Sequence, residues 1–181
     1  MLILPLCLSA WETRAVDTDT IRSLISNYFG NESRVSDARR PFYVSGDFNA
    51  DGVQDVAVLF QPGSGMKPSM QVNISSPWVF DVKDSKNNFH TSLAIINGHA
   101  EGLMSTKTSV FALLDQSGVL ETPAFKLMVV RRTNVDFQQY QGKLPVKTKG
   151  DILVLPTEAG IDTYVYWDKG GYQLYVPKKV P

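Results

Sequence analysis

The chain of 181 residues is poor in residues that carry redox or transition-metal chemistry, with one cysteine, Cys7, and two histidines, His90 and His99. A lone cysteine cannot form an intramolecular disulfide or a multi-thiolate metal site. The histidines are nine residues apart on or near one predicted strand, where they tend to face opposite sides. We therefore expect surface or capping histidines rather than a two-histidine metal site, with a Ser-His-Asp triad assembled in space as the open alternative.

The sequence also has no excess of either charge, since 18 Lys and Arg balance 18 Asp and Glu. A balanced charge creates no global field that would attract nucleic acid or an anionic membrane, so we expect no nucleic-acid partner. No apolar run reaches the roughly 18 residues that a membrane-spanning helix needs, so we expect no stable membrane anchor. A hydrophobic content of 43% is typical of a folded domain.

Residues 1–15 differ from the rest of the chain. Met1 to Ala10 is apolar, and Thr13-Arg14-Ala15 resembles the small-residue end of a secretory signal. A charged start is missing and the apolar core is short, so we predict a signal peptide or a truncated export segment; Pro5 disfavours the alternative, a buried strand. We expect a secreted or periplasmic protein in which residues 16–181 form one domain.

The periodicity of the chain predicts an α+β fold. Asp17–Phe29 has apolar residues at helical spacing, with Asp or Thr candidates for the N-cap and Gly30 after the end. Beyond Pro41 the period changes to two, which is typical of strands. We predict an N-terminal amphipathic helix packed on a mostly antiparallel β-sheet, with strands at Phe42–Phe48, Gln54–Phe60, Met70–Ser75, Thr91–Ile96, Ser109–Leu114, Phe125–Arg131, Asp151–Leu155, Asp162–Trp167 and Tyr172–Val176.

The last two predicted strands carry many aromatic residues. Asp168-Lys169-Gly170-Gly171 between them predicts a tight hairpin, because glycine supplies the positive φ that such turns require. The aromatic side chains favour cross-strand packing, and a stacking platform for sugar or peptide is the alternative. They are Tyr164, Tyr166, Trp167, Tyr172 and Tyr175.

The segment Gly46 to Asp55 carries the most specific pattern. Oxygen-bearing side chains stand at relative positions one, three, five and nine, and Gly52 allows a sharp turn. Ca²⁺ takes about six to eight oxygen ligands, which alternate side chains of a wound loop can supply. We predict a Ca²⁺ site with side-chain ligands Asp47, Asn49, Asp51 and Asp55 and the backbone carbonyl of Val53.

Other readings of this loop are weaker. An EF-hand needs a glutamate at relative position twelve, where this chain has Val58. Mg²⁺ prefers to keep several waters, and Zn²⁺ prefers His or Cys, which the loop lacks. A metal-free turn, in which Asp and Asn side chains cap their own backbone, is the alternative. Three clustered aspartates without a cation would repel one another, which favours the metal.

The loop resembles the calcium-binding hairpin of FG-GAP (integrin-α-like, VCBS-type) repeats. The pattern Asp-x-Asn/Asp-x-Asp-Gly-x-x-Asp is met by Asp47, Asn49, Asp51, Gly52 and Asp55. One copy is present, within Phe42–Phe60, and no Phe-Gly or Gly-Ala-Pro elements accompany it, so we do not expect a propeller. With the hairpin at Tyr164–Tyr172, the chain resembles small exported bacterial proteins that carry a single FG-GAP/VCBS repeat. The resemblance implies a calcium loop but no reaction.

From these features we expect a secreted or periplasmic calcium-stabilised binding or structural module that recognises a protein or glycan, and not an enzyme. One alternative is a hydrolase that uses carboxylates outside the loop, such as Asp81, Asp84 or Glu158. Another is an interaction protein that uses a basic face at 126–149, where Asp136 is the one acidic residue. The basic residues of that face are Lys126, Arg131, Arg132, Lys143, Lys147 and Lys149.

Overall fold

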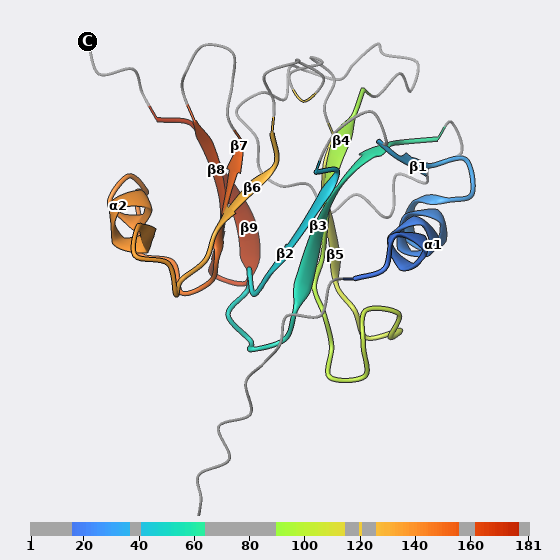
Figure 1. The fold of residues 1–181 in the computed structure, drawn as a ribbon, viewed down its shortest axis with the longest axis horizontal. Coiled ribbons are helices and arrows are strands. Elements are labelled where there is room, and N and C mark those ends of the chain that lie inside the picture. Colours follow the sequence, from blue (N-terminus) through green and yellow to red (C-terminus); the bar gives the residue numbers. More distant parts are fainter. Residues whose placement is uncertain are drawn as a thin grey trace, which may run out of the picture.

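The computed structural model describes residues 16–36, 41–63, 90–114, 120, 126–155 and 162–177. These residues form two helices and nine strands (Figure 1). The elements are α1 (Thr18–Phe29), β1 (Arg34–Val35), β2 (Tyr43–Gly46), β3 (Asp55–Gln61), β4 (Ser92–Ile96), β5 (Val110–Leu113), β6 (Met128–Val130), α2 (Phe137–Gln141), β7 (Ile152–Leu155), β8 (Thr163–Asp168) and β9 (Gly171–Tyr175).

The strands form two antiparallel sheets. Sheet A has the order β1-β3-β4-β5, and β2 also pairs with β3, next to β1 on the same edge. Sheet B has the order β6-β7-β8-β9. β3 is therefore paired along both edges, and its residues Asp55 to Phe60 are all buried. A strand that is covered on both faces needs apolar residues at every position, which explains its unbroken run Val56-Ala57-Val58-Leu59-Phe60.

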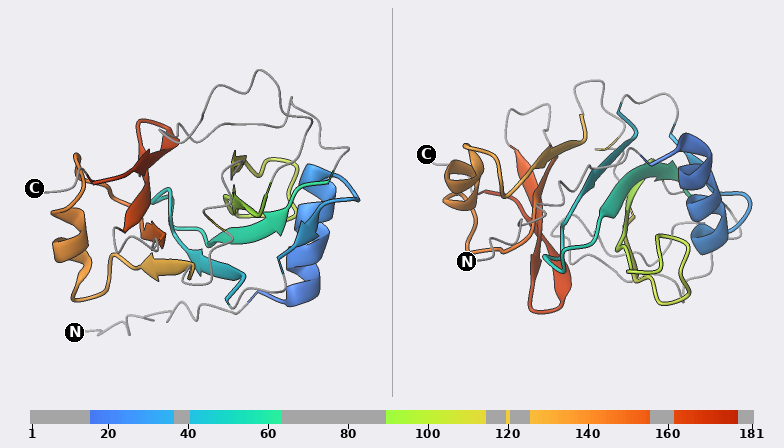
Figure 2. Two further views of the ribbon diagram at one scale, coloured as in Figure 1. Left: turned by 90° about the horizontal axis from the view of Figure 1, so that it is seen from above. Right: turned by 60° about the horizontal axis from the view of Figure 1, so that its bottom comes forward.

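The two sheets pack face to face, and a helix covers the outer face of each (Figures 1 and 2). The core between the sheets includes Leu59 and Ile95 from sheet A and Leu153 and Val165 from sheet B. Because side chains alternate along a strand, the opposite residues of β3 and β4 meet α1 in a second core. A third core lies between α2 and sheet B. The order of layers is α1, sheet A, sheet B, α2.

The N-terminal helix forms where the sequence predicts it. The Asp17 carboxylate accepts hydrogen bonds from the backbone nitrogens of Asp19 (3.1 Å) and Thr20 (3.2 Å), which caps the first turn. Gly30 ends the helix with φ 93° and donates to the Ser26 carbonyl oxygen. The buried residues of α1 are Ile21, Leu24, Ile25 and Phe29, which pack on sheet A.

The α+β class and the antiparallel pairing are confirmed, and the arrangement is more elaborate than one helix on one sheet. The strands split into two sheets, and both β1 and α2 lie where no element was predicted. Two-residue β1 and five-residue α2 are too short to show a period. The predicted strand Met70–Ser75 and residues 1–15 lie outside the described residues. In the part of the chain that is described, no helix has the length and apolarity to cross a membrane.

Candidate functional site

The predicted calcium loop joins β2 to β3, with Gly46 paired to Asp55 at its base. Gly52 (φ 84°) and Ala50 (φ 64°) adopt left-handed backbone conformations that bend the loop sharply. The loop also contacts sheet B. The backbone nitrogen of Asp47 donates to Asp151 Oδ2 (3.0 Å), and the backbone nitrogen of Asp151 donates to the Asp47 carbonyl oxygen (2.9 Å). The loop therefore lies at the junction of the two sheets.

Two side chains of the loop turn back onto its own backbone. Asn49 Oδ1 accepts from the backbone nitrogen of Asp51 (3.0 Å), and Asp51 Oδ1 accepts from that of Val53 (2.7 Å). The Asn49 amide also donates to Asp51 Oδ2 (2.8 Å). These are the local caps that short polar side chains make in turns, so part of the loop is stable without an ion.

Asp47 is different, because one of its oxygens has no partner. Its Oδ2 accepts from the backbone nitrogen of Gly52 (3.2 Å) and forms an ion pair with Arg132 Nη2 (3.0 Å). Its Oδ1 is buried and has no hydrogen-bond partner among the described residues. Burial raises the pKa of Asp47 above its usual value, and the Arg132 guanidinium opposes this shift. An unpaired buried carboxylate oxygen is costly, which makes Oδ1 a position for a further cation or donor.

Asp55 connects the loop to a neighbouring segment through backbone hydrogen bonds. Its side chain is fully buried and accepts three backbone hydrogen bonds, from Phe48 (2.7 Å), Asn49 (3.3 Å) and Gly98 (2.8 Å). Burial raises the pKa of Asp55 to about 7, although the three N–H donors act in the opposite direction. Asp55 thus connects the loop to the end of β4, a role that its place in the sequence motif does not reveal.

The donor set of the loop consists of oxygens alone, which matches the preference of a hard cation such as Ca²⁺. The unpaired Oδ1 of Asp47 supports such an ion. Across the described ranges, however, no three His, Cys, Asp or Glu side chains are grouped so that they could hold a metal ion. Ligands from Asn49 and the Val53 carbonyl would have to complete the set, with Asp55 sharing oxygens that already accept backbone N–H groups.

A cleft of about 550 Å³ adjoins the loop. One wall comes from the loop and the other from residues that follow β6 and precede β7. Within it, Arg131 Nη2 donates to the Ser45 carbonyl oxygen (3.2 Å), and the backbone nitrogen of Arg132 donates to Asp151 Oδ1 (2.8 Å). The lining residues are Gly46, Asp47, Gly52, Val53, Gln54, Arg131, Arg132, Thr133 and Asp151.

Two glycines permit the close packing around the loop. A Cβ atom on Gly150 would lie 1.9 Å from the Phe48 carbonyl oxygen, and one on Gly98 would lie 2.2 Å from the Gln54 carbonyl oxygen. Both distances are far below van der Waals contact with backbone, which cannot move aside like a flexible side chain. No other residue type fits these two positions without displacing the loop.

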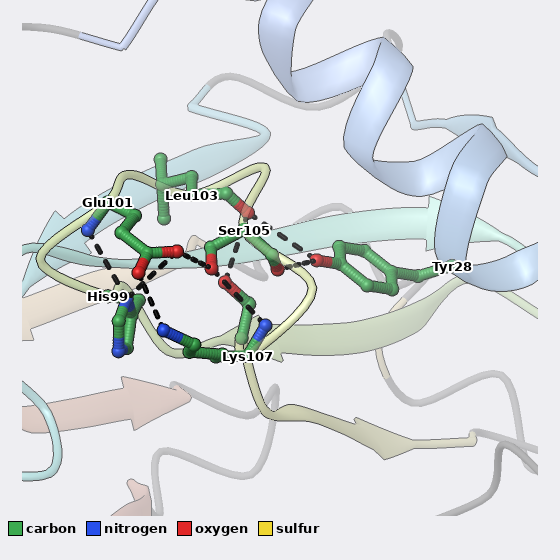
Figure 3. A network of polar contacts seen from close by, with 7 residues as sticks. Tyr28, His99, Glu101, Leu103, Ser105 and Lys107 are labelled. Atoms are coloured by element: carbon green, nitrogen blue, oxygen red, sulfur yellow. Dashed lines mark hydrogen bonds and ion pairs between the residues drawn. The ribbon is translucent and has the colours of Figure 1, made fainter.

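The described contacts of His99 are those of a turn residue. His99 lies in the connection between β4 and β5, where its Nδ1 accepts from the Glu101 backbone nitrogen (3.2 Å) (Figure 3). Glu101 binds Lys107 Nζ (2.6 Å) and Ser105 Oγ (3.1 Å), and these hydrogen bonds lower its pKa. His99 therefore caps a turn, as predicted, instead of bridging a hydroxyl and a carboxylate. His90 is exposed.

The aromatic residues of the C-terminal hairpin pack internally, as predicted. Trp167 and Tyr172 pack edge to face at 4.8 Å between ring centroids, and both also contact Phe111 of sheet A edge-on. Tyr164, Tyr166 and Tyr172 are buried, so these three cannot form a surface platform. The turn between the strands has φ 49° at Lys169 and φ 82° at Gly170, which confirms the predicted tight hairpin.

The remaining candidates are scattered or outside the described residues. Asp81, Asp84 and Glu158 lie outside the described ranges. The basic residues at 126–149 are exposed except Arg131, which is half-buried. Comparisons with protein-family models, with curated proteins and with solved structures gave no match to this chain. The loop and its cleft are therefore the features from which a function can be inferred.

We predict that Gly150→Ala lowers the free energy of unfolding by about 3 kcal/mol, because the methyl group would force the loop away from the start of β7. Gly171→Ala is the matched control, since a Cβ there meets nothing within 4 Å. Urea denaturation of both variants measures the difference. Equal stability of the two variants would contradict the close approach between Gly150 and Phe48.

We predict that Asp55→Asn, measured in EDTA, also lowers the free energy of unfolding by about 3 kcal/mol. An amide has one acceptor oxygen for three backbone N–H donors, and its own N–H groups face donors. Asp51→Asn makes the same change at an exposed residue of the same loop, where the amide oxygen can still accept from Val53 and water can replace the contact with Asn49. Its expected effect is below about 1 kcal/mol. Urea denaturation that finds Asp55→Asn as stable as Asp51→Asn contradicts the framework role.

Proposed function

We propose that this protein is a secreted or periplasmic, calcium-stabilised binding module. Residues 47–55 bind one Ca²⁺ through the side chains of Asp47, Asn49, Asp51 and Asp55 and the carbonyl oxygen of Val53. The observation that carries this proposal is the buried Oδ1 of Asp47, which has no hydrogen-bond partner among the described residues. An ion placed there would compensate an oxygen that the surrounding protein leaves unpaired.

The charges around the loop agree with a dication. The loop and cleft together carry four carboxylates, from Asp47, Asp51, Asp55 and Asp151, and two guanidinium groups, from Arg131 and Arg132. When all six groups are ionised, two negative charges remain. One Ca²⁺ matches that excess, whereas the ion pair between Asp47 and Arg132 neutralises a single carboxylate.

A metal-free loop is the competing explanation, and the two differ at Asp47. The caps made by Asn49 and Asp51 and the three hydrogen bonds to Asp55 would suit a loop without an ion. They leave the buried Oδ1 of Asp47 without a partner among the described residues, although Oδ2 of the same carboxylate is bound by Gly52 and Arg132. A bound cation accounts for the unpaired oxygen.

The proposed compartment is supported by the export segment predicted at residues 1–15, and the strength of the site is taken from calcium modules of that compartment. Extracellular calcium modules bind with dissociation constants of about 10⁻⁴ to 10⁻³ M. At about 1 mM Ca²⁺ and a dissociation constant near 10⁻⁴ M, binding adds roughly 1.4 kcal/mol to the stability. Because the loop contacts Asp151, this energy would stabilise the junction of the two sheets and one wall of the cleft.

We predict that 1 mM Ca²⁺ raises the melting temperature by about 4 °C relative to EDTA, as expected for roughly 1.4 kcal/mol in a domain of this size. Calorimetry in Ca²⁺, in Mg²⁺ and in EDTA measures the shift. Asp51→Asn removes one ligand charge, so its calcium response should require at least about tenfold more Ca²⁺.

Asp136→Asn is the matched control, because Asp136 is exposed and lies outside the loop. Its calcium response should equal that of the unmodified protein. Identical melting curves in Ca²⁺ and EDTA, or an undiminished response of Asp51→Asn, contradict the proposed site.

A further inference from the structure

We propose that the cleft beside the loop is a calcium-dependent binding site for a carboxylate group, with Arg131 and Arg132 as the residues that bind it. This inference rests on the proposed calcium site and specifies the ligand class of the binding module. It is carried by the cleft of about 550 Å³ and by the different partners of its two arginines.

Arg131 is the first of these residues. It is half-buried and lines the cleft, and among the described residues its side chain makes one hydrogen bond, from Nη2 to the Ser45 carbonyl oxygen (3.2 Å). Among the described residues no carboxylate lies within ion-pair distance of it. A guanidinium group has five N–H donors in a fixed plane, so four remain for a ligand. An anchored arginine without an acidic partner, placed in a cleft, is suited to bind an anion.

Arg132 is the second, and its side chain is held by the loop. Its Nη2 lies 3.0 Å from Asp47 Oδ2, and the side chain is 47% exposed. Calcium binding to Asp47 would place a second positive charge beside this guanidinium and weaken the ion pair. The side chain could then turn into the cleft while its backbone nitrogen stays on Asp151 Oδ1. Calcium would thus make a second arginine available to the ligand.

The electrostatic balance explains why the ion is needed. When all four carboxyl groups are ionised, the calcium-free loop and cleft carry two excess negative charges, which oppose the binding of an anion. With calcium this excess is cancelled, and Arg131 retains an unpaired positive charge. The cleft is therefore expected to accept an anion in the calcium-bound protein and to reject it in the calcium-free protein.

The geometry of the arginines specifies the ligand chemistry. A guanidinium group binds a carboxylate through two parallel hydrogen bonds, which a point charge such as lysine cannot reproduce. The cleft volume lies in the range of sites for small ligands, so it suits a single terminal group rather than a long polymer. An acidic sugar and the free C-terminus of a peptide both supply such a carboxylate.

The test uses the full chain and four probes, each titrated by NMR in Ca²⁺ and in EDTA. The first pair is glucuronate and neutral glucose. The second pair is an N-acetylated tripeptide with a free C-terminal carboxylate and the same tripeptide with a C-terminal amide. We expect saturable binding of at least one carboxylate probe and of neither neutral counterpart. Binding should be at least about tenfold weaker in EDTA. The two carboxylate arms distinguish a sugar acid from a peptide end.

Arg131→Gln removes the positive charge and should lower the affinity for the carboxylate probe at least about tenfold in Ca²⁺. Arg131→Lys keeps the charge but loses the planar fork, and should weaken binding less than Arg131→Gln. Lys147→Gln is the control, because Lys147 is an exposed basic residue of the same segment that does not line the cleft. The Lys147→Gln variant should bind the carboxylate probe with the same affinity as the unmodified protein.

Melting temperatures measured on the same samples separate the two proposals. One outcome is that calcium raises the melting temperature while no carboxylate probe binds, or while Arg131→Gln binds the probe as tightly as the unmodified protein does. Either result overturns the carboxylate site and supports the calcium site. Carboxylate binding of equal strength in Ca²⁺ and EDTA overturns the calcium dependence. An absent melting shift overturns the calcium site itself, whatever the probes show.

Discussion

The reciprocal backbone contact between Asp47 and Asp151 is the constraint on which the site depends. It fastens the β2–β3 loop to the start of β7, and so joins the two sheets at the point where the cleft opens. The contact needs a residue without a side chain at Gly150, because the loop backbone occupies the space of a Cβ atom. Any ion or ligand that changes the loop therefore acts on the junction of both sheets.

The carboxylates of this region differ in how far their oxygens are paired. Asp55 and Asp151 use both oxygens to accept backbone N–H groups, so their charges position segments that are distant in sequence. Asp47 keeps one oxygen unpaired, and its charge is compensated in part by Arg132. Removing a carboxylate from water is costly, so fully paired and partly paired carboxylates carry different energetic consequences. In the proposed calcium site, the framework role of Asp55 and the ligand role of Asp47 would differ in this way.

The sequence predicted those features whose cause is local. The cap at Asp17, the turn at Lys169 and Gly170, and the places of most strands depend on residues a few positions apart. The cleft could not be predicted, because its walls come from segments about 85 residues apart that meet through the packing of two sheets. The partner of Asp55 at Gly98 is hidden for the same reason. The division of the strands into two sheets depends on which strand pairs with which and on which sheet faces pack together. The side-chain alternation of a single strand does not specify these partners.

The loop is continuous with β3, a central and fully covered strand of sheet A. This strand is hydrogen-bonded along both edges and covered by apolar side chains on both faces, so its amides are expected to exchange with solvent only when the whole domain unfolds. The loop is anchored directly to the most persistent segment of the fold. We therefore expect the base of the loop to stay fixed if a ligand binds, so that any adjustment falls to side chains and to the few residues beyond Gly46.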